Sequence, residues 1–508
     1  MWNEGYTSEI DYTSGYYSEL APNRLKLALL SRGIDHSVPD HPTYLELGFG
    51  QGLSLNINSA TNSGTFVGTD FNPGQVANAR ELAAAMGKQI TLLEDSFEEF
   101  AARTDGSQYD IIALHGIWSW ISEGSRQAIV DIARRMLKPG GIFYISYNVT
   151  PGWSPAWPLR TLLSEYSTRE AKGTLVDRVA QSIDFVDRVI GADAAYFSQN
   201  PNLKARLEQI KRQDRNYIAH EYFNAHWDPV PFSALADRLA EAKLSFAASS
   251  NILENLPAIS IPAAAHQVLN EIKDSVLRET ARDYFVNQQF RRDIFVKGPR
   301  PIAPYNLTKR VDKERFILIG KPDACPEKIK TVAGEVDLRP EIYKPLSEAL
   351  ERAPENTASV EELRSTKSLS GLSTAQIWEA LLVLTSAGHV APVSSSVTPD
   401  EDVVASRALN AALMQRAEAG AGVDYLAAPK LGSATSVNRI EQLFIRALQL
   451  KAKNPVDHVW AVLDAQNQRL IVEGTTIEDE KENKAELARM LKIFEETRLN
   501  YLKKVGVF

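Results

Sequence analysis

The stretch Tyr44-Leu45-Glu46-Leu47-Gly48-Phe49-Gly50-Gln51-Gly52 decides the fold class of this 508-residue chain. A short β-type apolar run leads into three glycines, and a helical pattern begins directly after them. Glycines at such a turn let the backbone approach a ligand, which then lies at the positive N-terminal end of the helix. We therefore expect a strand-to-helix loop that binds a nucleotide-like ligand.

Outward from this loop, β-rich runs alternate with helical patterns between residues 44 and 148. The β-rich runs are YLEL, TFVGTD, ITLLED, YDIIALH and GIFYISY, and the helical patterns include PGQVANARELAAAM and SRQAIVDIARRML. This alternation predicts a mainly parallel sheet with helices on both faces. The predicted fold class is α/β, a Rossmann-like doubly wound sheet, followed by mainly helical α+β domains.

The spacing of the glycines distinguishes between nucleotide-like ligands. A dinucleotide fingerprint requires Gly or Ala at the last position of GxGxxG, but Leu53 stands there and Gly52 comes one residue early. NAD and FAD are therefore disfavoured.

Acidic or polar residues follow the next strands at the edge where open α/β sheets bind ligands. Asp70 closes the second run about twenty residues after the glycines, where a carboxylate accepts hydrogen bonds from ribose hydroxyls. The third run ends in Glu94-Asp95-Ser96 and the fourth in His115-Gly116-Ile117-Trp118. Leu137-Lys138-Pro139-Gly140-Gly141 precedes the fifth.

This set of motifs resembles that of the class I S-adenosylmethionine-dependent methyltransferases. The resemblance implies S-adenosylmethionine as cofactor and S-adenosylhomocysteine as product. It places the glycine loop at the methionine portion, the strand-two carboxylate at the ribose and the strand-three pair at the adenine, with no metal. The implied cofactor-binding residues are Tyr16, Tyr17, Glu46, Gly48, Gly50, Gly52, Asp70, Phe71, Asn72, Asp95, Ser96 and His115.

Aromatic residues gather at positions expected to line the mouth of this site. Methyl transfer mainly requires an in-line nucleophile held close with water excluded, and aromatic walls suit that task. Trp118, Tyr147 and Trp153 are the preferred candidates for an acceptor pocket, whereas Trp120 is less favoured because it fits the buried side of a helix start. Tyr12 precedes the first strand and belongs to the same group. Core packing is the competing interpretation for all of them.

His115 is the candidate catalytic base by position, and a structural or cofactor-packing role is its competing interpretation. The alternative base is His220. Glu221 beside it is a candidate for orienting a lysine ammonium from a helix that folds over the cofactor edge. A solvated ion pair at the start of that helix is the competing interpretation of Glu221.

Two downstream segments, Asn216-Tyr217-Ile218-Ala219-His220-Glu221-Tyr222-Phe223 and DYFVNQQFRRD at residues 283–293, resemble a methyltransferase regulatory domain. Together with YTSGYYSELAPNRL and HGIWSW, they are similar to the rickettsial protein-lysine methyltransferases that modify an outer-membrane surface protein. The resemblance implies a protein substrate with acceptor lysines. Arg291 and Arg292 are interpreted as structural ion-pair partners rather than substrate contacts.

Two other functions stay open at this point. One is an O-methyltransferase that acts on a saccharide or small molecule and uses a histidine or carboxylate base. The other is a non-catalytic winged-helix scaffold with a vestigial methyltransferase domain. A nucleic-acid methyltransferase is disfavoured, because HGIW replaces the (D/N/S)PP(Y/F) signature and the net charge of −8 does not suit a polyanion.

Five segments follow from the patterns along the chain. Residues 1–154 form the S-adenosylmethionine-binding domain with an N-terminal cap, and residues 155–216 form a helical connector. Residues 217–298 form the regulatory domain, residues 299–400 a winged-helix-like domain, and residues 401–508 a C-terminal α+β domain. The charged terminal helix has an apolar stripe that is a candidate homodimer interface, formed by Leu487, Leu491, Phe494 and Leu502.

The composition indicates the cellular compartment in which we expect the protein. Cys325 is the single cysteine, which excludes an internal disulfide, and no basic residue precedes Arg24 where a secretion signal would have its charged start. The longest apolar runs are shorter than the ~20 residues that cross a bilayer. We therefore expect a cytoplasmic protein without a membrane span.

Overall fold

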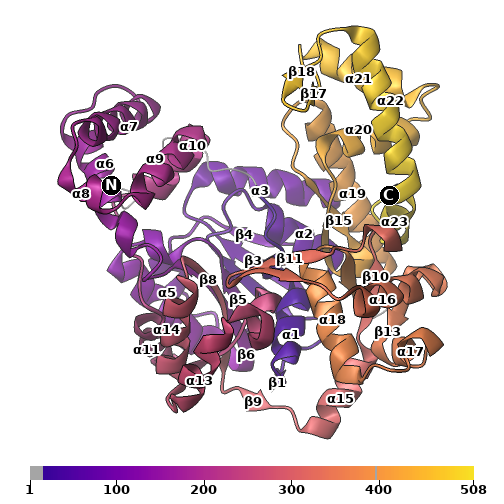
Figure 1. Ribbon diagram of the computed structural model, residues 1–508, viewed down its shortest axis with the longest axis horizontal. Coiled ribbons are helices and arrows are strands. Elements are labelled where there is room, and N and C mark those ends of the chain that lie inside the picture. Colours follow the sequence, from indigo (N-terminus) through magenta and orange to yellow (C-terminus); the bar gives the residue numbers. More distant parts are fainter. Residues whose placement is uncertain (1–14, 395–397) are drawn as a thin grey trace.

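The computed structural model describes residues 15–394 and 398–508, and a seven-stranded sheet lies at its centre (Figure 1). The strand order is β4-β3-β2-β5-β6-β8-β7. The strands are β2 (Thr43–Leu47), β3 (Thr65–Thr69), β4 (Thr91–Leu93), β5 (Tyr109–Leu114), β6 (Leu137–Asn148), β7 (Leu244–Ser249) and β8 (Phe290–Lys297). Strands β2 to β6 are parallel, and β8 is antiparallel to both of its neighbours. The predicted Rossmann-like α/β class is confirmed.

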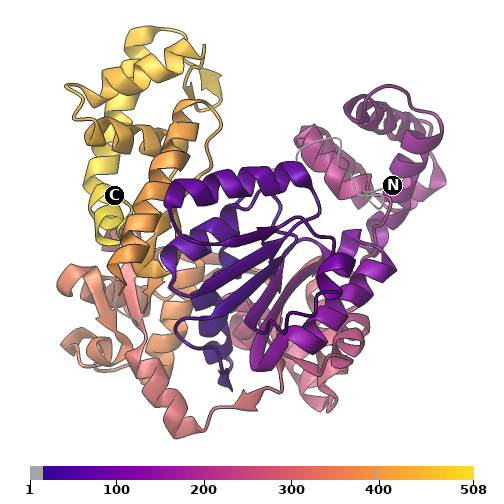
Figure 2. The same cartoon turned by 180° about the vertical axis from the view of Figure 1, so that it is seen from behind.

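Helices cover both faces of this sheet, as Figure 2 shows from behind. They are α1 (Pro22–Ser31), α2 (Leu53–Thr61), α3 (Pro73–Met86), α4 (Phe97–Ala101), α5 (Glu123–Met136), α11 (Phe232–Ala240), α13 (Ala263–Glu271) and α14 (Ser275–Val286). Neighbouring residues of β5 pack into different cores: Ile111 lies in the core with α1 and α2, and Ile112 lies in the core with α5 and α11. A strand buried on both faces reads as a continuous apolar run, which is why YDIIAL was recognisable in the sequence.

Strands β7 and β8 lie within residues 217–298, the segment expected to form the regulatory domain. This segment supplies the last two strands of the same sheet, so the sheet that begins at Thr43 is completed at Lys297. The charged residues of FRRDIFVK hide its strand pattern in the sequence. In the structure Arg291 and Asp293 point into the protein and pair with each other.

Arg291 lies at the centre of a buried ionic cluster. Its guanidinium donates to Asp293 at 2.7 Å, to Asp283 at 2.6 Å and to Glu279 at 3.1 Å, and it packs over the ring of Phe232. Arg292 pairs with Glu19 at 3.1 Å on the other side of the strand. The interpretation of both arginines as ion-pair partners is confirmed.

Replacing Arg291 with methionine is expected to lower the free energy of unfolding by about 3–5 kcal/mol, because three carboxylates would lose the buried guanidinium that pairs with them. Arg292→Met is the matched control, since its pair is partly exposed and is worth about 1 kcal/mol or less. Urea unfolding of both variants measures the difference. Equal losses would show that the Arg291 cluster does not stabilise the join between β6 and β8.

Residues 154–222 form a helical unit with its own core beside the sheet (Figure 1). Its helices are η3 (Ser154–Ala156), α6 (Trp157–Arg169), α7 (Leu175–Gly191), α8 (Ala195–Gln199), α9 (Asn202–Arg212) and α10 (Arg215–Tyr222). The side chain of Thr174 accepts a hydrogen bond from Asp177 N and begins α7 with a capping box. The last helix, α10, returns to the edge of the sheet.

Residues 299–394 form a small antiparallel sheet, β13-β10-β14, with helices packed against it. The elements are β9 (Arg300–Pro301), α15 (Pro304–Lys313), β10 (Arg315–Leu318), β11 (Lys328–Thr331), β12 (Gly334–Asp337), α16 (Pro340–Arg352), β13 (Thr357–Ser359), α17 (Val360–Arg364), α18 (Thr374–Ser386) and β14 (Val390–Val393). A winged-helix identity for this part stays a prediction.

The C-terminal residues pack against α2 and α3 (Figures 1 and 2). Their elements are α19 (Asp400–Glu418), β15 (Tyr425–Ala428), β16 (Ser433–Ser436), α20 (Arg439–Gln449), α21 (Pro455–Ala465), β17 (Ile471–Val472), β18 (Thr475–Thr476), α22 (Glu480–Thr497) and α23 (Leu499–Lys504). Leu487, Phe494 and Leu502 are buried in the core of this part. The stripe considered for a homodimer thus packs inside the chain. Among the described residues, no helix combines the length and apolarity needed to span a bilayer.

Candidate active site

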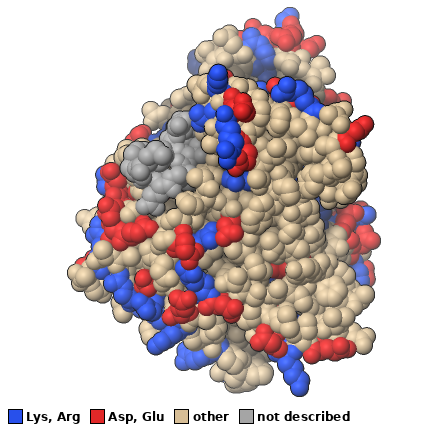
Figure 3. All heavy atoms as spheres, turned by 90° about the vertical axis from the view of Figure 1, so that its left-hand side faces the viewer, with Lys and Arg blue, Asp and Glu red and all other residues tan. Residues whose placement is uncertain are grey.

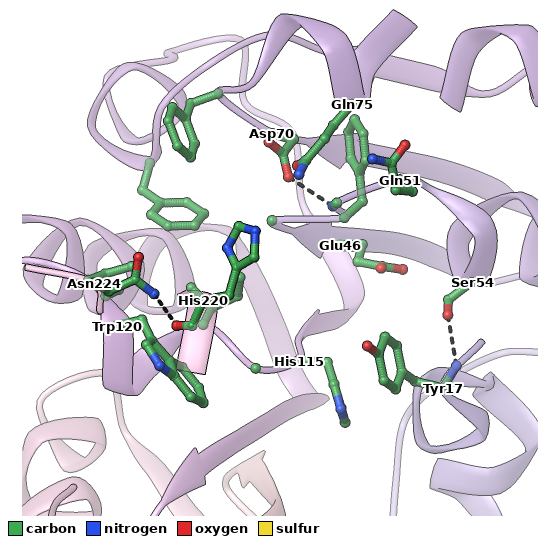
Figure 4. Close-up of a pocket in the computed structure, with 18 of the residues that line it drawn as sticks. Tyr17, Glu46, Gln51, Ser54, Asp70, Gln75, His115, Trp120, His220 and Asn224 are labelled. Atoms are coloured by element: carbon green, nitrogen blue, oxygen red, sulfur yellow. Dashed lines mark hydrogen bonds between the residues drawn. The ribbon is translucent and has the colours of Figure 1, made fainter. Parts of the chain in front are cut away.

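A cavity of about 460 Å³ lies beyond the carboxyl ends of the parallel strands. This is the edge at which open α/β sheets bind ligands, and the volume is typical of a small-molecule site. One half is lined by the loops after β2, β3 and β4. The other half is lined by residues after β5 and β6 and by α10 (Figure 4).

Three glycines shape the loop between β2 and α2. Gly48, Gly50 and Gly52 all have left-handed φ angles, of 70°, 56° and 74°. A Cβ at Gly52 would lie 2.4 Å from the Cβ of Ala79, so this glycine permits close packing of α2 against α3. A Cβ at Gly50 would meet nothing within 4 Å, because this position borders the cavity. The loop therefore leaves room for a ligand at the N-terminus of α2.

Gly52→Ala is expected to lower the free energy of unfolding by about 2–4 kcal/mol, from a strained φ angle and from the clash with Ala79. Gly50→Ala is the matched control, because it carries the same φ penalty of about 1–2 kcal/mol without a clash. Chemical unfolding of both variants tests the difference. A Gly52→Ala loss no larger than that of Gly50→Ala would contradict the packing role.

Asp70 follows β3 and is 5% exposed. Its carboxylate accepts hydrogen bonds from Gly50 N at 2.8 Å and from Asn72 N at 3.0 Å, so it is held beside the glycine loop (Figure 4). Burial raises the pKa of Asp70 to about 6, which leaves it mostly ionised at pH 7. A buried, ionised carboxylate in this position suits a pair of ribose hydroxyls.

Glu46 lies in β2 and also faces the cavity. It is 3% exposed, and its Oε2 makes no hydrogen bond to any of the described residues. Burial raises the pKa of Glu46 to about 8. Such a carboxyl fits a cationic partner, and the ammonium group of the expected cofactor is one. This orphaned oxygen, the open position at Gly50 and the Asp70 carboxylate together match S-adenosylmethionine.

The residues after β4 line the far end of the same half. Ser96 caps α4 through a capping box with Glu99, and Asp95 pairs with Arg103 at 2.5 Å. Both line the cavity, as does Phe71. Asn72 does not line it, because its side chain caps α3 instead.

The two N-terminal tyrosines, Tyr16 and Tyr17, point in different directions. The ring of Tyr17 stacks on His115 at 4.1 Å between centroids and lines the cavity. Tyr16 is directed away from the cavity: its hydroxyl accepts a hydrogen bond from Ala434 N in β16. The cofactor role expected for Tyr16 is therefore corrected. Tyr12 lies outside the described residues.

His115 is a packed residue in this structure. Its Nδ1 is 2.8 Å from the Tyr144 hydroxyl, and Tyr17 covers its ring. Burial lowers the pKa of His115 to about 4, so the ring is neutral at pH 7. These contacts favour the structural interpretation over that of a catalytic base.

Two of the aromatic residues expected to line the second half of the cavity lie outside it. Trp120 and Trp153 line the cavity, whereas Trp118 and Tyr147 lie outside it in the core under α5 and α11. The hydroxyl of Tyr147 donates to Asp293 at 2.7 Å. Tyr147 occupies the same face of β6 as Phe143 and Ile145, and that face points into this core.

The structure adds cavity residues that sequence reasoning missed. They are Gln75, Asn148, Tyr217, Asn224, Gln289 and Phe290, among others. The alternation of side chains along β6 could have identified Asn148, because it places Asn148 on the opposite side of the strand from Tyr147. Gln75 lies in the first turn of α3, whereas Tyr217, Asn224, Gln289 and Phe290 lie in or beside α10 and β8, which are distant in sequence.

His220 and Glu221 of α10 both line the second half of the cavity (Figure 4 labels His220). Burial raises the pKa of Glu221 to about 7, while the Asn148 amide and Arg206 oppose this shift. Asn148 is buried, and its Nδ2 makes no hydrogen bond of normal geometry to any described residue. The cavity thus holds a titratable carboxyl opposite the cofactor half.

Comparisons with known proteins agree with this geometry. Residues 45–141 match the family model of a methyltransferase domain, and residues 214–297 match that of a predicted methyltransferase regulatory domain. An uncharacterized protein of Synechocystis is 37% identical over 509 residues, which covers 100% of this chain and 99% of the relative. A protein of Rickettsia prowazekii is 28% identical over 302 residues, covering 56% of this chain and 51% of that protein.

The structure of PKMT2 from Rickettsia typhi in complex with AdoHcy is similar over 97% of this chain and 99% of that chain, with a TM-score of 0.67 and 17% identity. At this identity the likeness shows the fold alone. The similarity in fold covers the second half of the chain as well as the central sheet. The family models and the full-length relative show that the chain belongs to the class I S-adenosylmethionine-dependent methyltransferases with a methyltransferase regulatory domain.

Proposed function

We propose that this enzyme is an N-methyltransferase that methylates lysine side chains of a protein substrate. The observation that carries the proposal is the second half of the cavity, where Glu221 stands among aromatic rings opposite the glycine loop. The bound cofactor supplies an electrophilic methyl group. The protein has to bind the acceptor, exclude water and remove a proton from the acceptor nitrogen.

The main obstacle to lysine methylation is the extra proton that the lysine ammonium group carries at neutral pH. A lysine with the ordinary pKa of ~10.4 is almost entirely protonated at pH 7, a deficit of roughly 4.6 kcal/mol for the neutral form. An ionised Glu221 beside the ammonium first attracts it and then accepts its proton, and its raised pKa of about 7 suits that exchange. The buried aromatic surroundings disfavour the charged amine further.

The aromatic walls suit a long aliphatic side chain. Trp120 and Tyr217 border the cavity together with Phe290 and Trp153. Arg206 already covers one face of Trp153, at 4.0 Å from the ring centroid, and Arg292 lies over Phe290. Trp120 and Tyr217 are therefore the rings that would stabilise a methylated, cationic product by cation–π attraction.

The surroundings of the cavity fit a polypeptide better than a nucleic acid. The helical unit of residues 154–222 adds a wall to the cavity through Tyr217, His220 and Glu221 of α10. On the face shown in Figure 3, positive and negative side chains are interspersed, and the described surface there has no broad area of one sign. Nucleic-acid binding would require a basic footprint.

Incubation with isotope-labelled S-adenosylmethionine and a lysate of the source organism tests the acceptor class. We expect label in the protein fraction, on lysine after hydrolysis. Label confined to glycan, lipid or small molecules would refute the lysine proposal and support the O-methyltransferase alternative. Cofactor binding without transfer to any fraction would support the non-catalytic scaffold.

A further inference from the structure

The C-terminal residues cover the two helices that begin at the cofactor half of the cavity. All nine residues of α2 are buried, including Asn56, Asn58 and Ser59, although a helix on the face of a sheet normally leaves one side in water. Helix α19 and the strands β15 and β16 provide part of this cover, and Ser406 of α19 donates to the carbonyl of Ala60 at 3.0 Å. Asp402 of α19 pairs with Lys88 at 2.6 Å.

One line of contacts runs from α19 to the glycine loop. Arg416 donates to Asn78 Oδ1 at 2.9 Å, and Asn78 Nδ2 donates to the carbonyl of Gln51 at 2.8 Å. Gln51 lies between Gly50 and Gly52 and lines the cavity. Two consecutive hydrogen bonds therefore connect a side chain of the C-terminal part to this loop.

A second line runs from the β15–β16 hairpin to the opposite wall. Ala434 N donates to the Tyr16 hydroxyl at 3.1 Å, and the Tyr16 ring packs on Tyr425 at 5.3 Å. Tyr17, the next residue, donates its backbone N–H to Ser54 at 3.0 Å and stacks on His115 in the cavity (Figure 4). Consecutive Cα atoms are 3.8 Å apart, so a shift of Tyr16 moves Tyr17.

We propose that α19 and the β15–β16 hairpin form a C-terminal clamp that holds both walls of the cofactor site in their binding geometry. Arg416 and Tyr16 are its positioning residues, and they act through Gln51 and Tyr17. Because binding and docking are linked, a firmly docked clamp raises cofactor affinity, and a bound cofactor tightens the clamp.

The test is the binding of S-adenosylhomocysteine to the full-length protein, measured by isothermal titration, together with the melting temperature. Tyr16→Phe and Arg416→Met are each expected to raise the Kd roughly tenfold at a temperature where the protein is folded, within the usual range of coupling between sites. Arg416→Lys keeps a donor and is expected to recover most of the affinity. Because this binding needs no acceptor, the result is independent of the lysine proposal.

Asp402→Asn is the matched control. It weakens a contact between the same C-terminal part and the body of the protein, but it touches neither Gln51 nor Tyr17. We expect a lower melting temperature with a Kd within twofold of the wild type. Wild-type affinity in both Tyr16→Phe and Arg416→Met would overturn the clamp. The clamp would also be overturned if the loss of affinity were proportional to the decrease in melting temperature in every variant, Asp402→Asn included.

Discussion

Asp70→Ala is expected to weaken binding of S-adenosylmethionine about a hundredfold, or ~3 kcal/mol, while the protein remains folded. The lost interactions are hydrogen bonds from two ribose hydroxyls to a buried carboxylate that is already aligned by Gly50 and Asn72. The fold is retained because burial raises the pKa of Asp70 above its usual value, so its ionised form does not stabilise the folded protein at pH 7. Isothermal titration and circular dichroism measure both effects.

Asp105→Ala is the control for this experiment. Asp105 is exposed, far along the chain from the glycine loop, and its side chain accepts a hydrogen bond from Ser107 N. Its replacement should leave cofactor binding unchanged. Unaltered affinity in a folded Asp70→Ala protein would remove the ribose assignment. Wild-type affinity should also fall as pH decreases through about 6, where Asp70 becomes protonated.

Glu221→Gln is expected to lower kcat about a hundredfold or more at pH 7, with cofactor affinity unchanged, because the amide cannot accept the proton of the acceptor amine. The pH dependence has a definite sign. Burial raises the pKa of Glu221 to about 7, so the active carboxylate form is lost as pH falls below that value. The wild-type kcat/KM should therefore rise with pH through about 7.

Saturating cofactor separates this effect from the titration of Asp70 and Glu46, which act on cofactor binding. Under these conditions the Glu221→Gln enzyme should lose the inflection near pH 7 in its kcat/KM profile. Asn224→Ala is a useful comparison, because Asn224 lines the same half of the cavity without an ionisable group. An unchanged inflection in Glu221→Gln would show that another group removes the proton.

The sequence allowed prediction of the parts of this protein that depend on local chemistry. The glycine loop, Asp70 and the Asp95-Ser96 pair follow from residues that are adjacent to their own strands. Their positions at one edge follow from the parallel topology, since the carboxyl ends of all parallel strands meet there. These features needed no knowledge of distant contacts.

The errors came from features that depend on distant contacts. Strand β8 was missed because Arg291 and Asp293 neutralise each other inside the protein, which a pattern of polar and apolar residues cannot show. Tyr16 was assigned to the cofactor because its partner, Ala434, lies 418 residues away. Tyr147 was preferred as an aromatic near a strand end, but strand periodicity places Asn148 toward the cavity instead.

The most direct test of the two-part cavity is a crystal structure of this protein with S-adenosylhomocysteine. We expect ribose hydroxyls within hydrogen-bonding distance of Asp70, adenine near Ser96, and the amino group near Glu46. The sulfur should face the half of the cavity that holds Glu221. A nucleoside bound away from Asp70, or a sulfur directed away from Glu221, would refute the two-part cavity.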